Sequence, residues 1–143
     1  MQLLFGHDAS VTQWAAQKID GLTQPTFAFG VIDKEGALRG CFILQEITPN
    51  TAEFIVYAEA PCTPNVFFTF FDVAFNRIGY GRLQTTAQKS NAKAKKENPR
   101  WGFKFEGTAK DFFGQGQDAL RYGMLKANCK WLRKAKGKAN GTV

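Results

Sequence analysis

The sequence predicts a single α+β domain with three layers, in which helices cover both faces of a mixed, mostly antiparallel central sheet. Two observations support this fold class. Between residues 27 and 60, apolar runs rich in Phe, Ile and Val alternate with Gly, Pro and Asn, a pattern typical of a strand meander. After residue 65, apolar runs of helical length alternate with runs of strand length, which predicts helices packed against the same sheet.

Length and composition fit one globular domain. The chain has 143 residues, of which 44% are hydrophobic and 22% charged, and this excludes disordered and collagen-like classes. No apolar run approaches the roughly 20 residues that span a bilayer, and no signal-peptide pattern is present, so we expect a cytoplasmic protein without a membrane partner. The domain should cover residues 1–132, followed by a basic tail over residues 133–143.

The first predicted element is an amphipathic helix that ends near Gly21. Ser10 and Gln13 have the spacing of a capping box, which would begin the helix. Apolar residues then recur at helical spacing, at Val11, Trp14, Ala15 and Ile19. The single histidine, His7, precedes this helix and has no recognisable partner, so no nucleophilic triad is predicted.

Three strands should follow the first helix. Residues 27–32 and 38–47 predict an antiparallel hairpin, with Gly36 in the turn where a positive φ is needed. Residues 52–60 predict a third strand, which has on one face Phe54, Val56 and Ala58.

Residues 66–78 are too long and too apolar for a strand, so they predict a nearly buried helix. It should begin at Asn65 and end at Gly79. The helix carries five phenylalanines, at positions 67, 68, 70, 71 and 75. We expect them to form the core beneath the sheet, while the alternative is that Phe68 or Phe70 faces another subunit.

The remaining chain alternates between strands and helices. The expected elements are a strand over residues 83–88, a helix from Asn91, a strand over residues 102–106, a turn at 114–116, a strand over 120–125 and a short helix after Lys126. The whole order is then β-α-β-β-β-α-β-α-β-β, as required for one sheet with helices on both faces.

This order of motifs resembles the GCN5-related N-acetyltransferase (GNAT) superfamily, particularly its ribosomal-protein-acetylating branch. That branch carries an Asn at a helix start and a Gly-Phe-x-x-Glu-Gly signature eleven residues later; the matching positions here are Asn91, Gly102, Phe103, Glu106 and Gly107. The resemblance implies the GNAT-like three-layer fold and acetyl-CoA-dependent N-acyltransferase activity. Gly102 and Phe103 also fit a helix end and a core residue, so the signature indicates fold more than catalysis.

The same resemblance implies where acetyl-CoA would bind. The third meander strand would contact the cofactor at Val56 and Tyr57, the following helix would begin beside it at Asn65, and Asn91 would contact the pantetheine arm. Ala94 occupies the position of a family Ser, which removes one hydrogen bond to the cofactor.

Residues 59–65 depart from the family where the diphosphate would be bound. The family has a glycine-containing loop whose free N–H groups cradle the phosphates. Residues 59–65 contain no glycine and no basic residue, and Pro61 and Pro64 remove two donors. A charge-assisted phosphate contact is worth about 1.5–3 kcal/mol, so losing several would weaken cofactor binding by a few orders of magnitude.

Candidate catalytic groups are few. Glu53 and Glu59 lie on the strand where relatives carry the general base, and Tyr122 could be the acid that protonates the leaving thiolate. The structural alternatives are that Glu59 is solvated or paired with a lysine, and that Tyr122 is a packed sheet residue. The spacing of Cys41, Cys62 and Cys129 predicts neither a metal site nor a disulfide framework, but Cys62 could react if exposed.

The net charge of +7 is concentrated in two segments. One covers residues 89–100 and includes Lys89, Lys93, Lys95, Lys96 and Arg100; the other begins at Lys126 and continues through the tail. Such segments are usually solvated, but they attract nucleic acid, nucleotide phosphates or an acidic protein face. As an alternative to a solvated surface, residues 89–100 predict a nucleic-acid surface. The basic tail, together with exposed aromatic side chains, predicts contact with a protein partner or a neighbouring subunit.

Two functions remain open at this stage. One is an acyltransferase with a divergent loop; the other is a GNAT-like scaffold without cofactor, acting through protein interactions. The endings Tyr-Gly-Met-Leu at residues 122–125 and Cys-Lys-Trp-Leu at residues 129–132 resemble small basic family members encoded by bacteriophages. That resemblance implies a viral protein in the host cytoplasm or in the virion.

Overall fold

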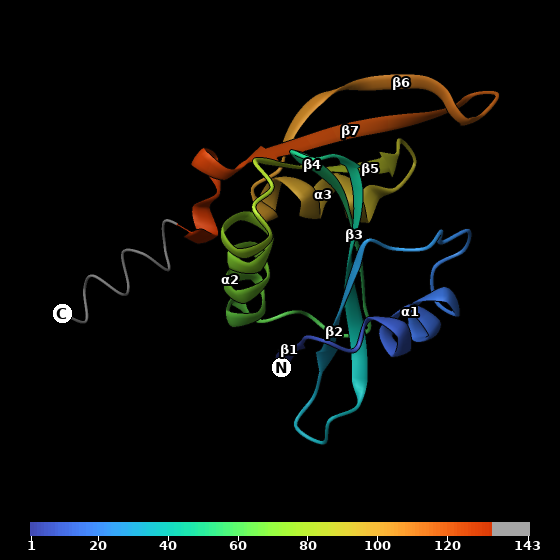
Figure 1. Cartoon of the computed structure of the whole chain (residues 1–143). Coiled ribbons are helices and arrows are strands. Elements are labelled where there is room, and N and C mark those ends of the chain that lie inside the picture. Colours follow the sequence, from blue (N-terminus) through green and yellow to red (C-terminus); the bar gives the residue numbers. More distant parts are fainter. Residues whose placement is uncertain (133–143) are drawn as a thin grey trace.

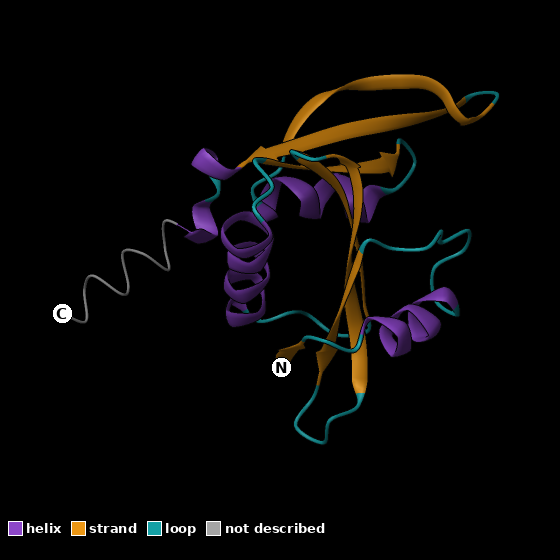
Figure 2. Ribbon diagram, viewed as in Figure 1, coloured by secondary structure: helices purple, strands orange, loops and turns teal. Residues whose placement is uncertain are grey.

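The computed structural model describes residues 1–132 and confirms the predicted fold class (Figures 1 and 2). One sheet has the strand order β1-β2-β3-β4-β5-β7-β6. Its strands are β1 (Gln2–Leu4), β2 (Phe27–Ile32), β3 (Leu38–Thr48), β4 (Thr51–Ala58), β5 (Arg82–Gln88), β6 (Lys104–Gly114) and β7 (Gln117–Leu125). Neighbouring strands are antiparallel except β4 and β5, which are parallel. The predicted tail lies outside the described residues.

Helices lie on both faces of the sheet (Figure 2). Helix α1 (Asp8–Ala16) covers one face of β2 and β3, where buried Val11 and Ala15 pack against the strands. The opposite face is covered by α2 (Pro64–Asp72), its π-helical continuation Val73–Ile78, and α3 (Ala92–Trp101). A short 3-10 turn, Lys126–Asn128, follows β7.

The face beneath α2 and α3 is an aromatic core. Phe70 of α2 contacts Phe42 of β3 and Phe54 of β4, with ring centroids 4.8 Å and 5.1 Å apart. Phe70 is fully buried, so it does not provide the surface that the subunit alternative requires. Phe68 is half-buried against Trp131.

Three exposed phenylalanines, Phe105, Phe112 and Phe113, lie instead on the hairpin of β6 and β7, which projects beyond β5 (Figure 1), and another, Phe5, follows β1. Strand β6 is longer than predicted and contains a register shift after Ala109. In this bulge Asp111 has a φ of 55°, and its Oδ1 accepts a hydrogen bond from the Gly116 N–H at 2.9 Å. The Asp118 carboxylate accepts another from the Asp111 N–H at 3.0 Å. The bulge is thus held in shape while it displays Phe112 and Phe113.

The predicted start of the first helix is wrong. Helix α1 begins at Asp8, which places Ser10 inside the helix and excludes the capping box. The Asp8 carboxylate accepts a hydrogen bond from the Ala28 N–H of β2 at 2.9 Å, so it ties the helix to the sheet. Residue 7 precedes the helix without a side-chain capping bond.

The long apolar helix begins one residue earlier than predicted. Its first residue is Pro64, which follows Thr63. Proline is favoured at the first position of a helix because the N–H that it lacks would have no partner there. Asn65 therefore lies within the first turn. At the other end, Gly79 adopts a φ of 100° and terminates the π-helical segment, as predicted.

Candidate functional site

Strands β4 and β5 pair only at their beginnings and then separate. The parallel pairs are Thr51 with Arg82, Ala52 with Leu83 and Glu53 with Gln84. Beyond them, β4 continues to Ala58 and β5 to Gln88 without pairing to each other. Figure 1 shows the two strands diverging. We call this opening the split; it leaves main-chain N–H and C=O groups of both strands without a strand partner on the facing edges.

The predicted cofactor residues of β4 lie in its unpaired part. The Val56 side chain packs toward the aromatic core, whereas the Tyr57 ring lies on the α1 face, 5.8 Å from the ring of Trp14. Val56 and Tyr57 therefore face the split with their main-chain groups and not with their side chains.

Asn91 lies directly after β5 and caps α3, as predicted. Its Oδ1 accepts a hydrogen bond from the Ala94 N–H at 3.0 Å. The side-chain oxygen is therefore committed to the helix start, which leaves the amide nitrogen as its free polar group.

The loop between β4 and α2 offers few phosphate donors. Thr63 precedes the helix in an extended conformation without a side-chain capping bond, and the Val66 N–H is bonded to the Thr63 carbonyl at 3.1 Å. Pro64 has no N–H at all. Asn65, in the first turn, is exposed and uncharged.

The thiols show no sign of activation. As predicted, Cys41, Cys62 and Cys129 are thiols that form no disulfide with one another. Burial raises the pKa of the half-buried Cys62 thiol, and the negative charge of Glu97 on α3 raises it further. Burial also raises the pKa of Cys41, to about 11. Both side chains are therefore protonated thiols at neutral pH, poor nucleophiles by comparison with a thiolate.

Glu59 and Tyr122 lie on opposite faces of the sheet. The Glu59 carboxylate lies 3.4 Å from Lys18 Nζ and accepts a hydrogen bond from the Tyr57 hydroxyl at 3.4 Å. Tyr122 is paired with Thr85, the first residue of β5 after its last pair with β4 and so at the beginning of the split, and its ring is buried in the aromatic core. Within residues 1–132 the Tyr122 hydroxyl has no hydrogen bond, and no fully buried polar side-chain atom there lacks one, so this hydroxyl reaches solvent.

A network of four side chains crosses the α1 face next to the split. Arg82 of β5 donates to both carboxylate oxygens of Glu106, with Nη1 2.8 Å from Oε2. Arg82 Nη2 also donates to Gln84 Oε1 at 3.2 Å, and Gln84 Nε2 donates to Glu53 Oε1 at 3.1 Å. The hydrogen bonds from Arg82 lower the pKa of Glu106, and the same interaction raises the pKa of Arg82.

The sequence contains only part of the signal for this network. Arg82 and Gln84 are two residues apart on a strand, which places them on one face. Their partners Glu53 and Glu106 lie 29 and 24 positions away from Arg82 on other strands, and no local pattern indicates that they bond to Arg82 and Gln84.

Metal centres, membrane-spanning helices and basic surfaces are three other kinds of site that the described part of the chain could carry. No three His, Cys, Asp or Glu side chains of residues 1–132 come together as metal ligands. None of the helices described is long and apolar enough to cross a membrane. The lysines and Arg100 of α3 form an exposed basic surface, where Lys130 Nζ also donates to the Arg100 carbonyl.

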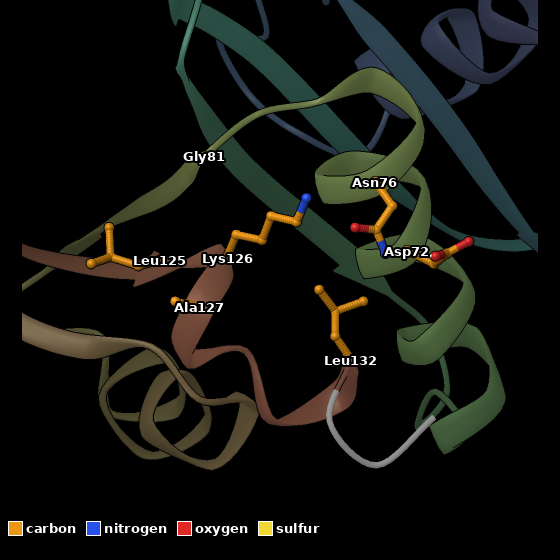
Figure 3. A pocket seen from close by; sticks show the side chains of 7 residues that line it. All are labelled: Asp72, Asn76, Gly81, Leu125, Lys126, Ala127 and Leu132. Carbon is orange, nitrogen blue, oxygen red and sulfur yellow. Dashed lines mark hydrogen bonds between the residues drawn. The ribbon is translucent and has the colours of Figure 1, made fainter. Parts of the chain in front are cut away.

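An open hollow lies elsewhere, where β5 begins and β7 ends (Figure 3). It is lined by Asp72, Asn76, Gly81, Leu125, Lys126, Ala127 and Leu132. Asp72 is already bonded to Asn76 at 2.9 Å and to Arg77 at 3.4 Å. The split opens toward the other end of β5, so the hollow is separate from the candidate site.

Solved structures share this arrangement of strands and helices. A dodecameric spermidine N-acetyltransferase from Vibrio cholerae is 25% identical, with a TM-score of 0.63, and the match covers 76% of this chain and 68% of the other. A GCN5-related N-acetyltransferase from Brucella melitensis is 23% identical, with a TM-score of 0.64 over 84% of this chain and 59% of its own. This chain has the GNAT fold.

A third similar structure has nearly the same length as the chain. It is a spermidine N-acetyltransferase chimera from Vibrio cholerae and hSSAT, 18% identical, with a TM-score of 0.71 over 93% of this chain and 99% of its own. No protein-family model matches the chain, and no curated protein matches its sequence. The GNAT fold therefore rests on three-dimensional similarity at low identity.

Proposed function

We propose that this protein is an acetyl-CoA-dependent N-acyltransferase whose cofactor arm lies between β4 and β5. The observation that carries the proposal is the split itself. A gap between parallel strands leaves N–H and C=O groups available to an extended amide-containing chain such as pantetheine. The similarity to solved N-acetyltransferases supports the same activity.

The residues fit the two ends of acetyl-CoA differently. The edges of β4 and β5 can bond the pantetheine arm, and the exposed amide of Asn91 lies at the end of β5. The diphosphate end fits poorly, because the loop before α2 lacks glycine and basic residues and its prolines lack N–H groups. Binding should therefore depend on the arm more than on the phosphates.

The acceptor would enter from the α1 face and lose a proton there. Acetyl-CoA, when bound, supplies the activated acyl group and a thiol leaving group. Glu53 of β4, or Glu59 directly after it, would take the proton of the acceptor amine, and the Tyr122 hydroxyl on the opposite face would donate a proton to the thiol leaving group. Polyamines and ribosomal proteins are the first acceptors to test, since similar structures and the sequence resemblance name these two classes.

Calorimetry with two thioesters tests the proposal. We expect acetyl-CoA to bind the full chain with micromolar affinity, and S-acetyl-pantetheine, which lacks the diphosphate, to bind within about tenfold of it. If several charge-assisted contacts held the diphosphate, the affinities of the two thioesters would differ by about a hundredfold or more. The absence of binding by either ligand at millimolar concentration would refute the enzyme.

The second candidate is a GNAT scaffold that binds a macromolecule without cofactor. It is favoured by the proline-containing loop and by the exposed basic surface of α3. A protein partner contacting the tail, including a role as a bacteriophage virion component, belongs to this candidate, as does nucleic-acid binding through residues 89–100. Steep salt dependence of DNA retention would support the latter, and flat retention would exclude it.

A further inference from the structure

The network on the α1 face has a feature that ordinary surface ion pairs lack: it crosses a strand that contributes no side chain to it. Glu106 is on β6 and Arg82 is on β5, while β7 lies between them with Gly123 at the crossing. A Cβ on residue 123 would be 2.6 Å from Arg82 Nη1 and closer still to Glu106 Oε2. A side chain at position 123 would therefore displace the ends of Arg82 and Glu106 from their present positions.

The direction of each hydrogen bond in the network follows from chemistry alone. Arg82 can only donate, so the group of Gln84 that faces it must be the carbonyl oxygen. The amide nitrogen of Gln84 is then directed at Glu53 and can only donate to it. This arrangement fixes the position of Glu53 Oε1, which accepts the Gln84 hydrogen bond at 3.1 Å.

The location of Glu53 gives the network a function. Glu53 is the last residue of β4 that pairs with β5, so its carboxylate lies where the split begins. Within the described residues, Glu53 makes no hydrogen bond or ion pair besides the one from Gln84, which leaves its second oxygen available. Glu59, by contrast, is at the far end of β4 and is held by Lys18 and Tyr57.

Stability alone does not explain the four side chains. Gln84 is 8% exposed, and the burial of a polar amide costs free energy that its hydrogen bonds only offset. Partly exposed ion pairs contribute about 0–1 kcal/mol. Apolar residues at these positions would pack at least as well, so the arrangement fixes a geometry rather than adding stability.

We propose that Glu53 is the proton acceptor for the incoming amine and that Gln84, Arg82 and Glu106 are positioning residues that hold its carboxylate at the split. This inference rests on the proposed acyltransferase function. The charged group that interacts with Glu53 is Arg82 on β5, while Gln45 on β3, which pairs with Glu53, is neutral and bonded to Thr23. Glu106 on β6 interacts with Arg82, and Arg121 on β7 interacts with Glu106. The acceptor amine therefore meets one carboxylate whose orientation is fixed from one side.

Activity tests the assignment. Glu53→Gln should lower kcat/KM by about 10²–10⁴-fold, and Glu35→Gln, the matched control in the exposed turn between β2 and β3, should stay within about threefold of wild type. Gln84→Met removes only the hydrogen bonds, so it should lower kcat by about tenfold and leave the KM for acetyl-CoA within about twofold, because Glu53 loses its fixed orientation while the cofactor contacts are kept. Full activity in Glu53→Gln would overturn the catalytic role.

A cofactor-independent measurement separates this inference from the proposed function. The ¹³C resonance of the Glu53 carboxyl can be observed in the free protein at neutral pH, where Gln84→Met should shift it because the hydrogen bond from Gln84 Nε2 to Glu53 Oε1 is lost. Glu106→Gln, at an exposed site that does not threaten folding, should shift it less. If these variants lose activity while the Glu53 resonance stays unchanged, the positioning role is refuted. If wild type transfers no acyl group but the resonance shifts, only the proposed function fails.

Discussion

Residues 53 and 54 are neighbours on β4, yet they belong to two faces built from opposite kinds of side chain. Phe54 lies among rings, with the centroids of Phe42 and Phe103 5.6 Å and 5.5 Å away. Glu53 lies in a network of amide, guanidinium and carboxylate groups. Apolar burial is non-directional and determines stability, whereas hydrogen bonds determine the orientation of particular atoms. The two faces should therefore respond differently to substitution.

The largest effect on stability is expected from Phe54→Ala on the aromatic face. Phe54 is 1% exposed, and its truncation leaves a cavity among packed rings that cannot collapse. We expect a loss of about 3–5 kcal/mol in the free energy of unfolding, measured by urea denaturation. The control Phe112→Ala removes an exposed ring from the β6–β7 hairpin and should change stability by less than about 0.5 kcal/mol. Equal losses in both variants would contradict the assignment of the core.

The polar face should show a smaller, pH-dependent effect. The pKa of Glu106 is lower in the folded state, so its pair with Arg82 stabilises the protein above the unfolded pKa of Glu, about 4.3, and this contribution is lost as the pH falls through the folded value. Both side chains are partly exposed, at 24% for Arg82 and 41% for Glu106, so solvent screens the pair. We expect Glu106→Gln to cost about 1 kcal/mol or less at pH 7.

The measurement is the difference in unfolding free energy between wild type and Glu106→Gln across pH 7 to 3. The difference should shrink toward zero at the acidic end, because protonated Glu106 no longer forms the ion pair. A difference that stays constant with pH would show that the substitution acts through packing instead.

The element order could be predicted from the sequence because apolar periodicity is local. The start of helix α1 could not be predicted from the sequence. The Asp8 carboxylate bonds to Ala28 of β2 rather than to its own helix, and this long-range contact overrides the local capping pattern at Ser10. The length of β6 was not predictable either, because the bulge at Asp111 interrupts the alternation of side chains between the two faces of the strand.

The candidate site was predictable only in its location. The sequence resemblance points to β4 and to the start of α3 at Asn91, and the structure places both beside the split. The network was not predictable, because it depends on β4 pairing with β5 across an intervening helix and on β6 lying two strands from β5. Such register is set by the whole fold and not by the spacing of residues along the chain.

The smallest effect should come from the other carboxylate of β4. Glu59 and Lys18 are each 32% exposed and 3.4 Å apart, and Lys18 also lies 5.4 Å from the centre of the Trp14 ring. Lys18→Met keeps the apolar stem but removes the charge, so the loss of stability should be about 0–0.5 kcal/mol and should vanish in high salt. Thermal unfolding at low and high ionic strength measures it. A loss above about 1.5 kcal/mol would exceed what an exposed ion pair contributes. It would mean that the Glu59–Lys18 pair is coupled to other parts of the fold, including the network at Glu53.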